Sequence, residues 1–217
     1  MKFTQTAESK VFFTSDPHFS HKNICAGVTT WVTLPENFNL LTKQKKEEFC
    51  KLNGLRNFRT IDEMNSTILN RINEKVGEND ILFILGDVGF GGKETTGKFM
   101  SQLVCKNVHL IYGNHDKYIE RNEDGLQGYF KSCSYLREIT VDNQRITLCH
   151  YAMRVWNKSH RGAWQLYGHS HGSLPDDSNA LSIDVGVDTN DMYPYSFDDI
   201  KRIMEKKNYK SIDHHRE

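Results

Sequence analysis

Five short apolar runs each end in acids, amides or histidines, and this repeated pattern constrains the fold more than any other feature of the chain. The runs are rich in Val, Ile, Leu and Phe and are bounded by turn residues, as buried strands are. They are Val11–Thr14, Ile81–Leu85, Val108–Tyr112, Ile146–Cys149 and Trp164–Tyr167, with a sixth run at Leu181–Val187. The pattern predicts buried strands whose carboxyl ends carry polar groups.

Helical patterns separate the early strands. Residues 60–63 have the form of a capping box, and apolar residues then recur at intervals of three and four as far as Val76. A second helix is predicted over about 93–104, and residues 196–199 predict the cap of a last one. Strands alternate with helices early and follow one another quickly over 135–187. This order predicts an α/β fold built on two layered sheets.

Composition limits the class of protein. With 217 residues, of which 37% are apolar, the chain predicts one large domain rather than two small ones. Lys plus Arg and Asp plus Glu both total 28, so no net charge attracts nucleic acid or an anionic membrane. No apolar run has the length of a signal peptide core or a membrane span. Five cysteines without a zinc-knuckle spacing indicate reduced thiols in a cytoplasmic protein.

Residues 28–59 fit this alternation least well, because they show no sustained period. Their charged stretch, 43–51, is predicted to be a helical insertion. The segment covers a site or is solvated surface, and the second reading is favoured.

The polar groups at the strand ends form a distinctive set of donors. Two Asp, one Asn and four His follow the five runs: Asp16, His18, Asp87, Asn114, His150, His169 and His171. Each alone has a simpler explanation as a turn former or helix cap. In α/β folds, however, the carboxyl edge of a sheet is where ligands bind. Carboxylate and imidazole donors without thiolates suit Mn²⁺, Fe²⁺, Zn²⁺ or Ni²⁺. Seven donors exceed one tetrahedral site and fit two ions that share a bridging carboxylate.

Read in order, the motifs DxH, GD, GNHD, a strand-end His and GHxH resemble the calcineurin-like metallophosphoesterase superfamily. The flanking segments TSDPHFSHKNI, RNFRTIDEMN, HYAMRVWNKSHRGAWQLYGHSHG and SIDVGVD resemble a compact bacterial and phage-encoded branch of it. The resemblance implies a four-layer α/β/β/α sandwich of two mixed sheets flanked by helices. It also implies one metallophosphoesterase domain over 1–217, with an insertion at about 28–59, in the cytoplasm (that of the host if phage-encoded).

The resemblance also implies roles for the donors. Asp16, His18 and His171 would hold a first ion, and Asn114, His150 and His169 a second. Asp87 would bridge the two ions, which makes it both a metal ligand and a catalytic residue. His115 would contact the phosphate and assist the leaving group as a catalytic residue. The cofactors implied are two divalent ions, with Mn²⁺ favoured and Fe, Zn or Ni as alternatives.

Other residues are predicted to contact substrate with less support from their position. His21, Arg154, His160 and Arg161 are these candidates. Asp116 is interpreted equally as a group that orients His115 or as a helix cap. Trp156 and Trp164 would stack on a base or, as the favoured reading, pack in the core.

These features support three functional hypotheses. The first is a phosphodiesterase that uses a metal-activated hydroxide on a cyclic nucleotide, a dinucleotide or a nucleic-acid end. The second is a phosphomonoesterase for nucleotides or other small phosphates, and the third is a non-catalytic metal-binding scaffold. The segment GDVGFGGKETTG lacks the phosphate-clamping arginine of related protein phosphatases, which argues against a phosphoprotein substrate. The expected partner is a small phosphorylated substrate, not long duplex nucleic acid or a membrane.

Overall fold

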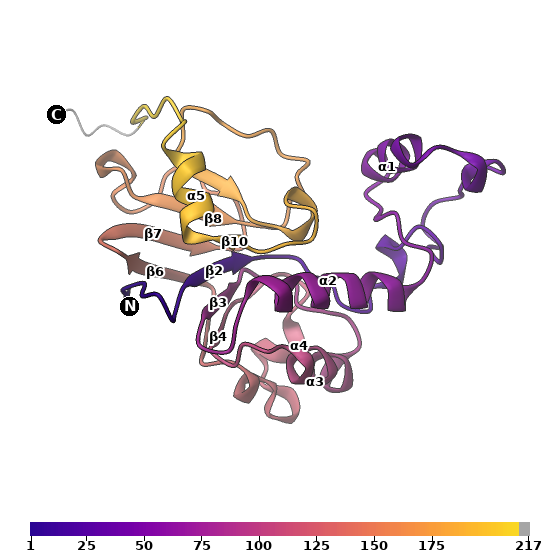
Figure 1. The fold of residues 1–217 in the computed structure, drawn as a ribbon, viewed down its shortest axis with the longest axis horizontal. Helices are drawn as coiled ribbons and strands as arrows, with labels where there is room; N and C mark the ends of the chain where they lie inside the picture. Colours follow the sequence, from indigo (N-terminus) through magenta and orange to yellow (C-terminus); the bar gives the residue numbers. More distant parts are fainter. Residues whose placement is uncertain (213–217) are drawn as a thin grey trace.

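Buried aliphatic and aromatic residues build two five-stranded sheets in the computed structural model, which describes residues 1–212 (Figure 1). The first sheet has the order β10-β2-β3-β4-β5. Its strands are β10 (Tyr195–Ser196), β2 (Val11–Thr14), β3 (Ile81–Ile84), β4 (Val108–Ile111) and β5 (Ser132–Ser134). Strands β2 to β5 are parallel, and β10 pairs with β2 in the antiparallel sense. The parallel strands therefore bring their carboxyl ends to one edge.

The second sheet is also mixed and has the order β1-β6-β7-β8-β9. Its strands are β1 (Lys2–Phe3), β6 (Leu136–Val141), β7 (Gln144–Cys149), β8 (Trp164–Tyr167) and β9 (Ser182–Asp184). Only the β6–β7 pair is antiparallel among the described strands of this sheet. The predicted run 181–187 is shorter as a strand, because the chain turns at Gly186 to bridge Ser15 of the other sheet.

Helices cover the outer face of the first sheet. They are α2 (Ile61–Lys75), α3 (Gly92–Gln102) and the short α4 (Lys117–Glu120), followed by the 3₁₀ segment η3 (Glu123–Tyr129). Helix α2 begins at the predicted cap, where Thr60 Oγ1 accepts a hydrogen bond from Glu63 N at 3.1 Å. It buries Met64, Ile68 and Ile72 against β2, β3 and β4. Each such side chain stabilises the fold by about 1.5–3 kcal/mol.

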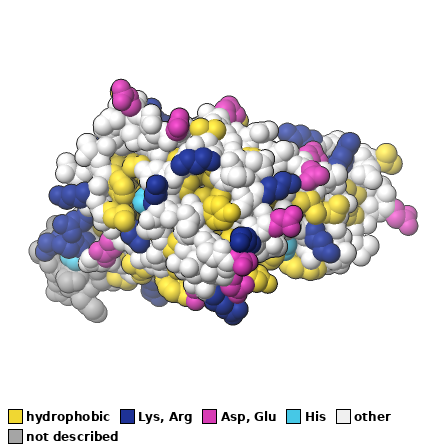
Figure 2. All heavy atoms as spheres, turned by 90° about the horizontal axis from the view of Figure 1, so that it is seen from below, with side chains coloured by type: hydrophobic (Ala, Val, Ile, Leu, Met, Phe, Trp, Pro, Cys, Tyr) yellow, Lys and Arg dark blue, Asp and Glu magenta, His cyan; other side chains and the backbone are white. Residues whose placement is uncertain are grey.

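The surface seen from below in Figure 1, where α3 and α4 lie, is shown in Figure 2. Lys, Arg, Asp and Glu side chains are interspersed there rather than gathered by sign. The arrangement agrees with the zero formal net charge.

A second apolar core lies between the two sheets. Phe13 and Phe83 of the first sheet stack with ring centroids 5.5 Å apart, and they meet Ile146 and Leu166 of the second sheet. Helix α5 (Phe197–Met204) packs its buried side chains into this core. Its predicted cap is confirmed, since the Ser196 side chain and Asp199 form a capping box.

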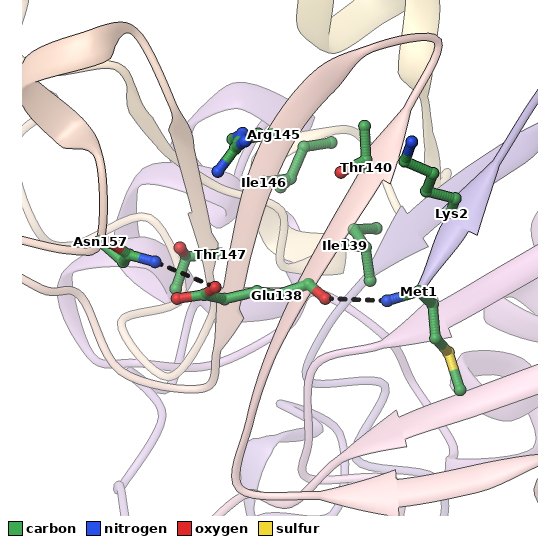
Figure 3. Close-up of a pocket in the computed structure, with 9 residues that line it drawn as sticks. All are labelled: Met1, Lys2, Glu138, Ile139, Thr140, Arg145, Ile146, Thr147 and Asn157. Atoms are coloured by element: carbon green, nitrogen blue, oxygen red, sulfur yellow. Dashed lines mark hydrogen bonds between the residues drawn. The ribbon is translucent and has the colours of Figure 1, made fainter.

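The outer face of the second sheet carries polar side chains and the loop that includes η4 (Ser159–Arg161). A cavity of about 290 Å³ opens on this face, and Figure 3 shows the residues that line it. The Met1 amine donates to the Glu138 carbonyl oxygen at 3.3 Å, and Asn157 Nδ2 donates to Glu138 Oε2 at 3.1 Å. The lining residues come from the N-terminus, from within β6 and β7, and from the loop at Asn157, not from the strand ends that carry the predicted ligands.

Residues 26–58, here called the lobe, project away from the sheets with helix α1 (Lys43–Leu52) at the far side (Figure 1). Ala26, Phe38, Cys50 and Leu55 form a small core of their own within it. The lobe includes η2 (Phe38–Leu40), and η1 (Lys22–Ile24) precedes it. The helix predicted at 43–51 is therefore confirmed. That the segment is an insertion stays a prediction.

The expected fold class is confirmed as an α/β sandwich of two mixed sheets with helices. The helix predicted at 93–104 is also confirmed within two residues at each end. Every strand expected to precede a polar loop forms, and the two sheets present these loops together.

Candidate metal centre

Loops from both sheets meet at the carboxyl ends of β2, β3, β4, β7 and β8. The contact between the sheets is direct, because His169 N after β8 donates to Asp16 Oδ2 after β2 at 2.8 Å. Within each sheet the neighbouring loops are also bonded. Asp16 N donates to the Gly86 carbonyl at 3.0 Å, and Gly168 N donates to the His150 carbonyl at 2.9 Å. The predicted ligands therefore share one region of the fold.

Asp16, His18 and His171 form the first metal-ligand group. One donor atom of each lies within 4.8 Å of the others. Asp16 Oδ1 is 3.6 Å from His18 Nε2 and 3.8 Å from His171 Nε2. These separations leave space for one ion at the centre of the group.

Asp87, His150 and His169 form the second group, again within 4.8 Å. His150 Nε2 is 3.7 Å from Asp87 Oδ2 and 3.1 Å from Asn114 Oδ1. The amide oxygen of Asn114 therefore lies where the sequence predicted a fourth donor.

Asp87 connects the two groups. Its Oδ2 is 3.5 Å from His18 Nε2 in the first group as well as 3.7 Å from His150 Nε2 in the second. A carboxylate between two sets of donors is the arrangement of a bridging ligand in a two-metal site.

Two buried atoms of the first group test whether a cation fits. Asp16 Oδ1 and His18 Nε2 have no hydrogen-bond partner and no exposed surface. Leaving a buried donor or acceptor unsatisfied costs about 1–3 kcal/mol, more for a charged group. A divalent ion removes this cost, because the carboxylate oxygen and the imidazole nitrogen both become its ligands. The chemistry of the two groups therefore fits divalent cations.

Ionisation of the first group also suits metal binding. Burial lowers the pKa of the His18 imidazole, which keeps the ring neutral. Burial alone would raise the pKa of Asp16, but His18, His171 and His150 lower it overall and keep the carboxylate charged. Metal ligands need these forms, a neutral imidazole and an ionised carboxylate.

The outer nitrogens of two histidines are already engaged, so that Nε2 faces the centre. His150 Nδ1–H donates to the Leu85 carbonyl at 2.6 Å. His171 Nδ1–H donates to Asp188 Oδ2 at 2.6 Å. Burial would lower the pKa of His171, but the bond and charge of Asp188 raise it. Such a partner fixes the tautomer and makes Nε2 a more basic ligand.

Most of the predicted ligands adopt an uncommon backbone conformation. Their φ angles lie in the left-handed region: Asp16 (55°), His18 (48°), Asp87 (53°), His169 (65°) and His171 (48°). Non-glycine residues reach this region in only a few per cent of cases, and strained positions cluster at functional sites. The surrounding structure therefore holds these side chains in a set orientation.

Two glycines allow the loops to approach closely. A Cβ atom on Gly113 would lie 2.2 Å from Asp87 Oδ1, and one on Gly168 would lie 2.3 Å from Asp16 Oδ2. No side chain fits at either position without displacing a ligand carboxylate.

Arg56 of the lobe supports the first group. Its side chain is 4% exposed and donates through Nε and Nη2 to both oxygens of Asp188, at 2.8 and 2.7 Å. It also donates to the carbonyl oxygens of Pro17 and Asp16, at 2.8 and 2.6 Å. Burial would raise the pKa of Asp188, but Arg56 and His171 hold it well below its usual range. Arg56 thus fixes both the loop of Asp16 and the partner of His171.

These supporting residues were missed in the sequence. Arg56 and Asp188 lie in the flanking segments RNFRTIDEMN and SIDVGVD, which drew attention only by their resemblance. A buried arginine in a charged loop has no periodic signal. Its role depends on a contact with a residue 132 positions away.

The carboxylate of Asp116 has a role that neither sequence interpretation predicted. It accepts hydrogen bonds from the backbone amides of Asp87, Val88 and Gly113, at 2.8, 2.9 and 2.8 Å. The cap interpretation is wrong, because the side chain makes no capping bond to α4. Both oxygens are occupied by amides rather than by the His115 ring. Asp116 therefore fastens the loop of Asp87 to the loop of Asn114.

His115 lies at the mouth of the centre. Its backbone N donates to Asp87 Oδ1 at 2.8 Å, and its exposed ring lies 5.6 Å from the His18 ring and 4.8 Å from Phe90, between centroids. His21 is also close, since its Nδ1 is 3.2 Å from His18 Nδ1. The roles of His115 in catalysis and of His21 in substrate contact stay predictions.

The other predicted substrate contacts lie elsewhere. Arg154 lines a cavity of about 430 Å³ with Trp156 and Tyr167. His160 and Arg161 lie in η4 on the outer side of the second sheet. The structure shows no contact of Arg154 or Arg161 with either metal-ligand group within residues 1–212. Their role as substrate contacts stays a prediction.

The two tryptophans pack as the favoured interpretation predicted. Trp156 is 5% exposed and its Nε1 donates to the Ala163 carbonyl at 2.9 Å. Trp164 is 6% exposed and stacks on Phe197, with centroids 5.5 Å apart. Neither ring faces the metal-ligand groups.

Comparison with known proteins agrees with this geometry. The sequence profile of the calcineurin-like phosphoesterase family matches residues 9–206. The uncharacterised protein MJ1445 of Methanocaldococcus jannaschii is 25% identical over 203 residues, which cover 91% of this chain and 92% of that protein. A crystal structure of the protein of unknown function AQ665 from Aquifex aeolicus shares the fold, with a TM-score of 0.56 and 18% identity. That match covers 90% of this chain and 99% of the other.

Along residues 1–212, no helix has the length and apolar character needed to cross a membrane.

Proposed function

Because this chain belongs to the calcineurin-like phosphoesterase family, we propose that it is a metal-dependent hydrolase of phosphodiesters, with two divalent ions held by its two metal-ligand groups. Asp16, His18 and His171 hold the first ion in this proposal. Asn114, His150 and His169 hold the second, and Asp87 bridges them. The pair of unsatisfied buried atoms, Asp16 Oδ1 and His18 Nε2, is the observation that carries the proposal.

In the proposed reaction, the ions, the ligand residues and His115 have different roles. When bound, two divalent ions lower the pKa of water and neutralise phosphoryl oxygens. The protein's part in this proposal is to position the phosphorus in line with the attacking water. The ligand residues with left-handed φ angles, whose orientation the fold fixes, would provide this positioning. The His115 imidazole hydrogen-bonds a phosphoryl oxygen or gives its proton to the departing alkoxide. General acid catalysis of this kind contributes about 10²–10⁴ in rate.

A diester suits the charges of the site better than a monoester. A monoester brings one more negative charge, and enzymes that bind it commonly supply arginine forks. Here Arg56 lies beside the first group, but its Nε, Nη1 and Nη2 atoms already bond Asp188, Pro17 and Asp16. This engagement supports a singly charged phosphate as the substrate.

The proposed substrate is small. Side chains of both signs are mixed on the face shown in Figure 2, which offers no continuous basic track for duplex nucleic acid. The five cysteines are free thiols, which supports the cytoplasm as the proposed compartment. Mn²⁺ is the proposed metal, because mixed Asp, Asn and His donors suit it.

The test is a metal screen with bis-p-nitrophenyl phosphate and p-nitrophenyl phosphate. We expect Mn²⁺ to restore activity to metal-stripped protein, with kcat/KM for the diester at least about tenfold above that for the monoester. A wide preference for the monoester would reverse the substrate proposal. Protein that binds one of these metals yet cleaves neither ester would instead be the non-catalytic metal-binding scaffold.

A further inference from the structure

Three aromatic side chains, His21, Phe90 and Trp31, lead outward from the first metal-ligand group, and they are here called the aromatic wall. The His21 ring stacks on Phe90 with centroids 3.7 Å apart and on the ligand His18 at 5.3 Å. Trp31 meets His21 edge to face at 5.3 Å. His115 completes the contact on the inner side, 4.8 Å from Phe90. The wall therefore runs without a break from a metal ligand to the lobe.

Trp31 occupies an unusual position for an indole. It is 66% exposed, whereas Trp156 and Trp164 are 5% and 6% exposed. Large aromatic side chains normally bury their surface, and an exposed ring next to a reaction centre is a platform on which a flat group can stack. The fold has placed this tryptophan beside the candidate metal centre and left most of its surface free.

The backbone holds Trp31 in this place. Its N–H donates to Thr29 Oγ1 at 3.2 Å, and Thr29 Oγ1 donates in turn to the Asn23 carbonyl at 2.7 Å. The Asn23 side chain accepts from Thr30 N and Oγ1, at 3.2 and 3.0 Å. Asn23 follows His21 by two residues, so the turn that carries the indole is tied to the base of the aromatic wall. A pre-positioned ring loses little conformational freedom when it binds.

We propose that the aromatic wall is a subsite for the nucleoside part of the substrate, in which the nucleobase stacks on Trp31. The inference rests on the proposed function, since it names the group attached to the phosphate at the same centre. His21 supports the indole, which it meets edge to face, and Phe90 contacts the sugar in this proposal. A purely aliphatic ester would gain nothing from this wall, so the subsite selects nucleoside esters.

A fluorescence titration tests stacking without any reaction. Because Trp31 is the exposed tryptophan, adenosine 5′-monophosphate should quench the red-shifted part of the intrinsic emission, and ribose 5-phosphate should not. Trp31→Phe should abolish the quenching while the emission of the two buried tryptophans remains. Equal quenching by both phosphates, or quenching that survives in Trp31→Phe, would overturn the proposal.

A kinetic comparison tests selectivity. The two substrates are thymidine 5′-(p-nitrophenyl phosphate) and methyl p-nitrophenyl phosphate, which share a leaving group. Trp31→Leu should lower kcat/KM for the thymidine ester about tenfold and leave that for the methyl ester unchanged. Trp31→Phe should keep most of the activity, and Tyr129→Leu, at another exposed aromatic, should behave as wild type.

The results of these two experiments distinguish a failure of the nucleoside subsite from a failure of the proposed diesterase function. Equal losses on both esters would indicate a structural role and overturn the subsite, as would no loss on either. If wild-type protein cleaves neither ester with any metal yet shows base-dependent quenching, the subsite stands and the proposed diesterase does not.

Discussion

The two metal-ligand groups use the same kinds of donor but are supported differently. In the first group, His171 depends on Asp188 and, through it, on Arg56 of the lobe. In the second, His150 is oriented by the Leu85 carbonyl at the end of β3. The first group therefore relies on side chains far apart in sequence, and the second on the backbone of the strands themselves. If the proposed two-ion centre is correct, we therefore expect that the first ion can be lost while the second remains.

Asp87→Asn should have the largest effect, because the Asp87 carboxylate lies close to histidine side chains of both groups. Replacing its charged oxygen by an amide weakens both ions together. We expect kcat for bis-p-nitrophenyl phosphate to fall by at least about 10³-fold. Inductively coupled plasma mass spectrometry should find fewer than two ions per chain.

The matched control is Asp124→Asn. Asp124 is exposed and has a left-handed φ of 52°, a conformation that asparagine adopts readily. This variant should keep full activity and both ions. If Asp87→Asn kept both as well, Asp87 would not bridge the groups.

Arg56→Met should weaken the first metal-ligand group and leave the second intact. The variant removes the guanidinium from the partly buried Asp188 carboxylate, which keeps only the bond from His171 Nδ1, and we expect a cost of about 1.5–3 kcal/mol of unfolding free energy. It also frees the loop of Asp16 and the ring of His171. We expect one ion per chain rather than two, and a loss of about 10²-fold in kcat/KM, with urea unfolding of metal-free protein as the stability measurement.

The double variant Arg56→Met/Asp188→Asn tests the reason for that loss. Because it removes the Asp188 charge that has lost its guanidinium, it should recover part of the unfolding free energy but not the first ion. Loss of both ions in Arg56→Met would show that the groups are not independent.

Sequence alone predicted the strands that precede the polar loops, because each is an apolar run that ends in turn residues and polar groups. Strand ends such as Thr14 and Tyr167 were predictable because apolar runs and turn residues have local signals. The gathering of Asp16, Asp87 and Asn114 followed, because the parallel strands β2, β3 and β4 align their carboxyl ends.

The supports of the centre were not predictable in the same way. Arg56 and Asp188 meet across 132 positions, and the partners of Asp116 are backbone amides that leave no mark in the sequence. The lobe posed the same difficulty. Its apolar residues, such as Phe38 and Leu55, are too few and too unevenly spaced to show a period. Trp31 was not singled out, because exposure is a property of the folded chain.

Asp116→Asn should affect the second group more than the first. Asparagine retains one acceptor oxygen and places an NH₂ group against a backbone amide, so at least one of the three bonds is lost. The expected loss is about 1.5–3 kcal/mol in unfolding free energy. The affinity for the second ion should fall about 10–100-fold, as measured by titration with Mn²⁺. A weaker first ion with an unchanged second would contradict the assignment of Asp116 to the second group.

The smallest effect should come from Asp199→Asn, far from either group, and it calibrates the others. Asp199 Oδ2 accepts from Ser196 N at 3.0 Å and from Ser196 Oγ at 2.6 Å at the start of α5. Loss of a helix cap costs about 1 kcal/mol. Both ions and the activity should be unchanged. If this destabilisation alone removed an ion, the loss of an ion in Arg56→Met would result from lower overall stability of the fold rather than from the lost contacts of Arg56 with the first group.

The pH dependence of this cap distinguishes it from a loss of packing. Burial would raise the pKa of Asp199, but the hydrogen bonds from Ser196 and the charge of Lys75 lower it overall. A carboxyl whose pKa is lower in the folded state stabilises that state above its unfolded pKa of about 3.9, and the contribution disappears as the pH falls through the folded value. The difference in unfolding free energy between wild type and Asp199→Asn, measured on metal-free protein, should therefore be constant from pH 7 to 5 and shrink below about pH 4. A difference that persisted unchanged at lower pH would arise from shape rather than charge. The stabilisation by the capping box would then not depend on the ionised Asp199 carboxylate.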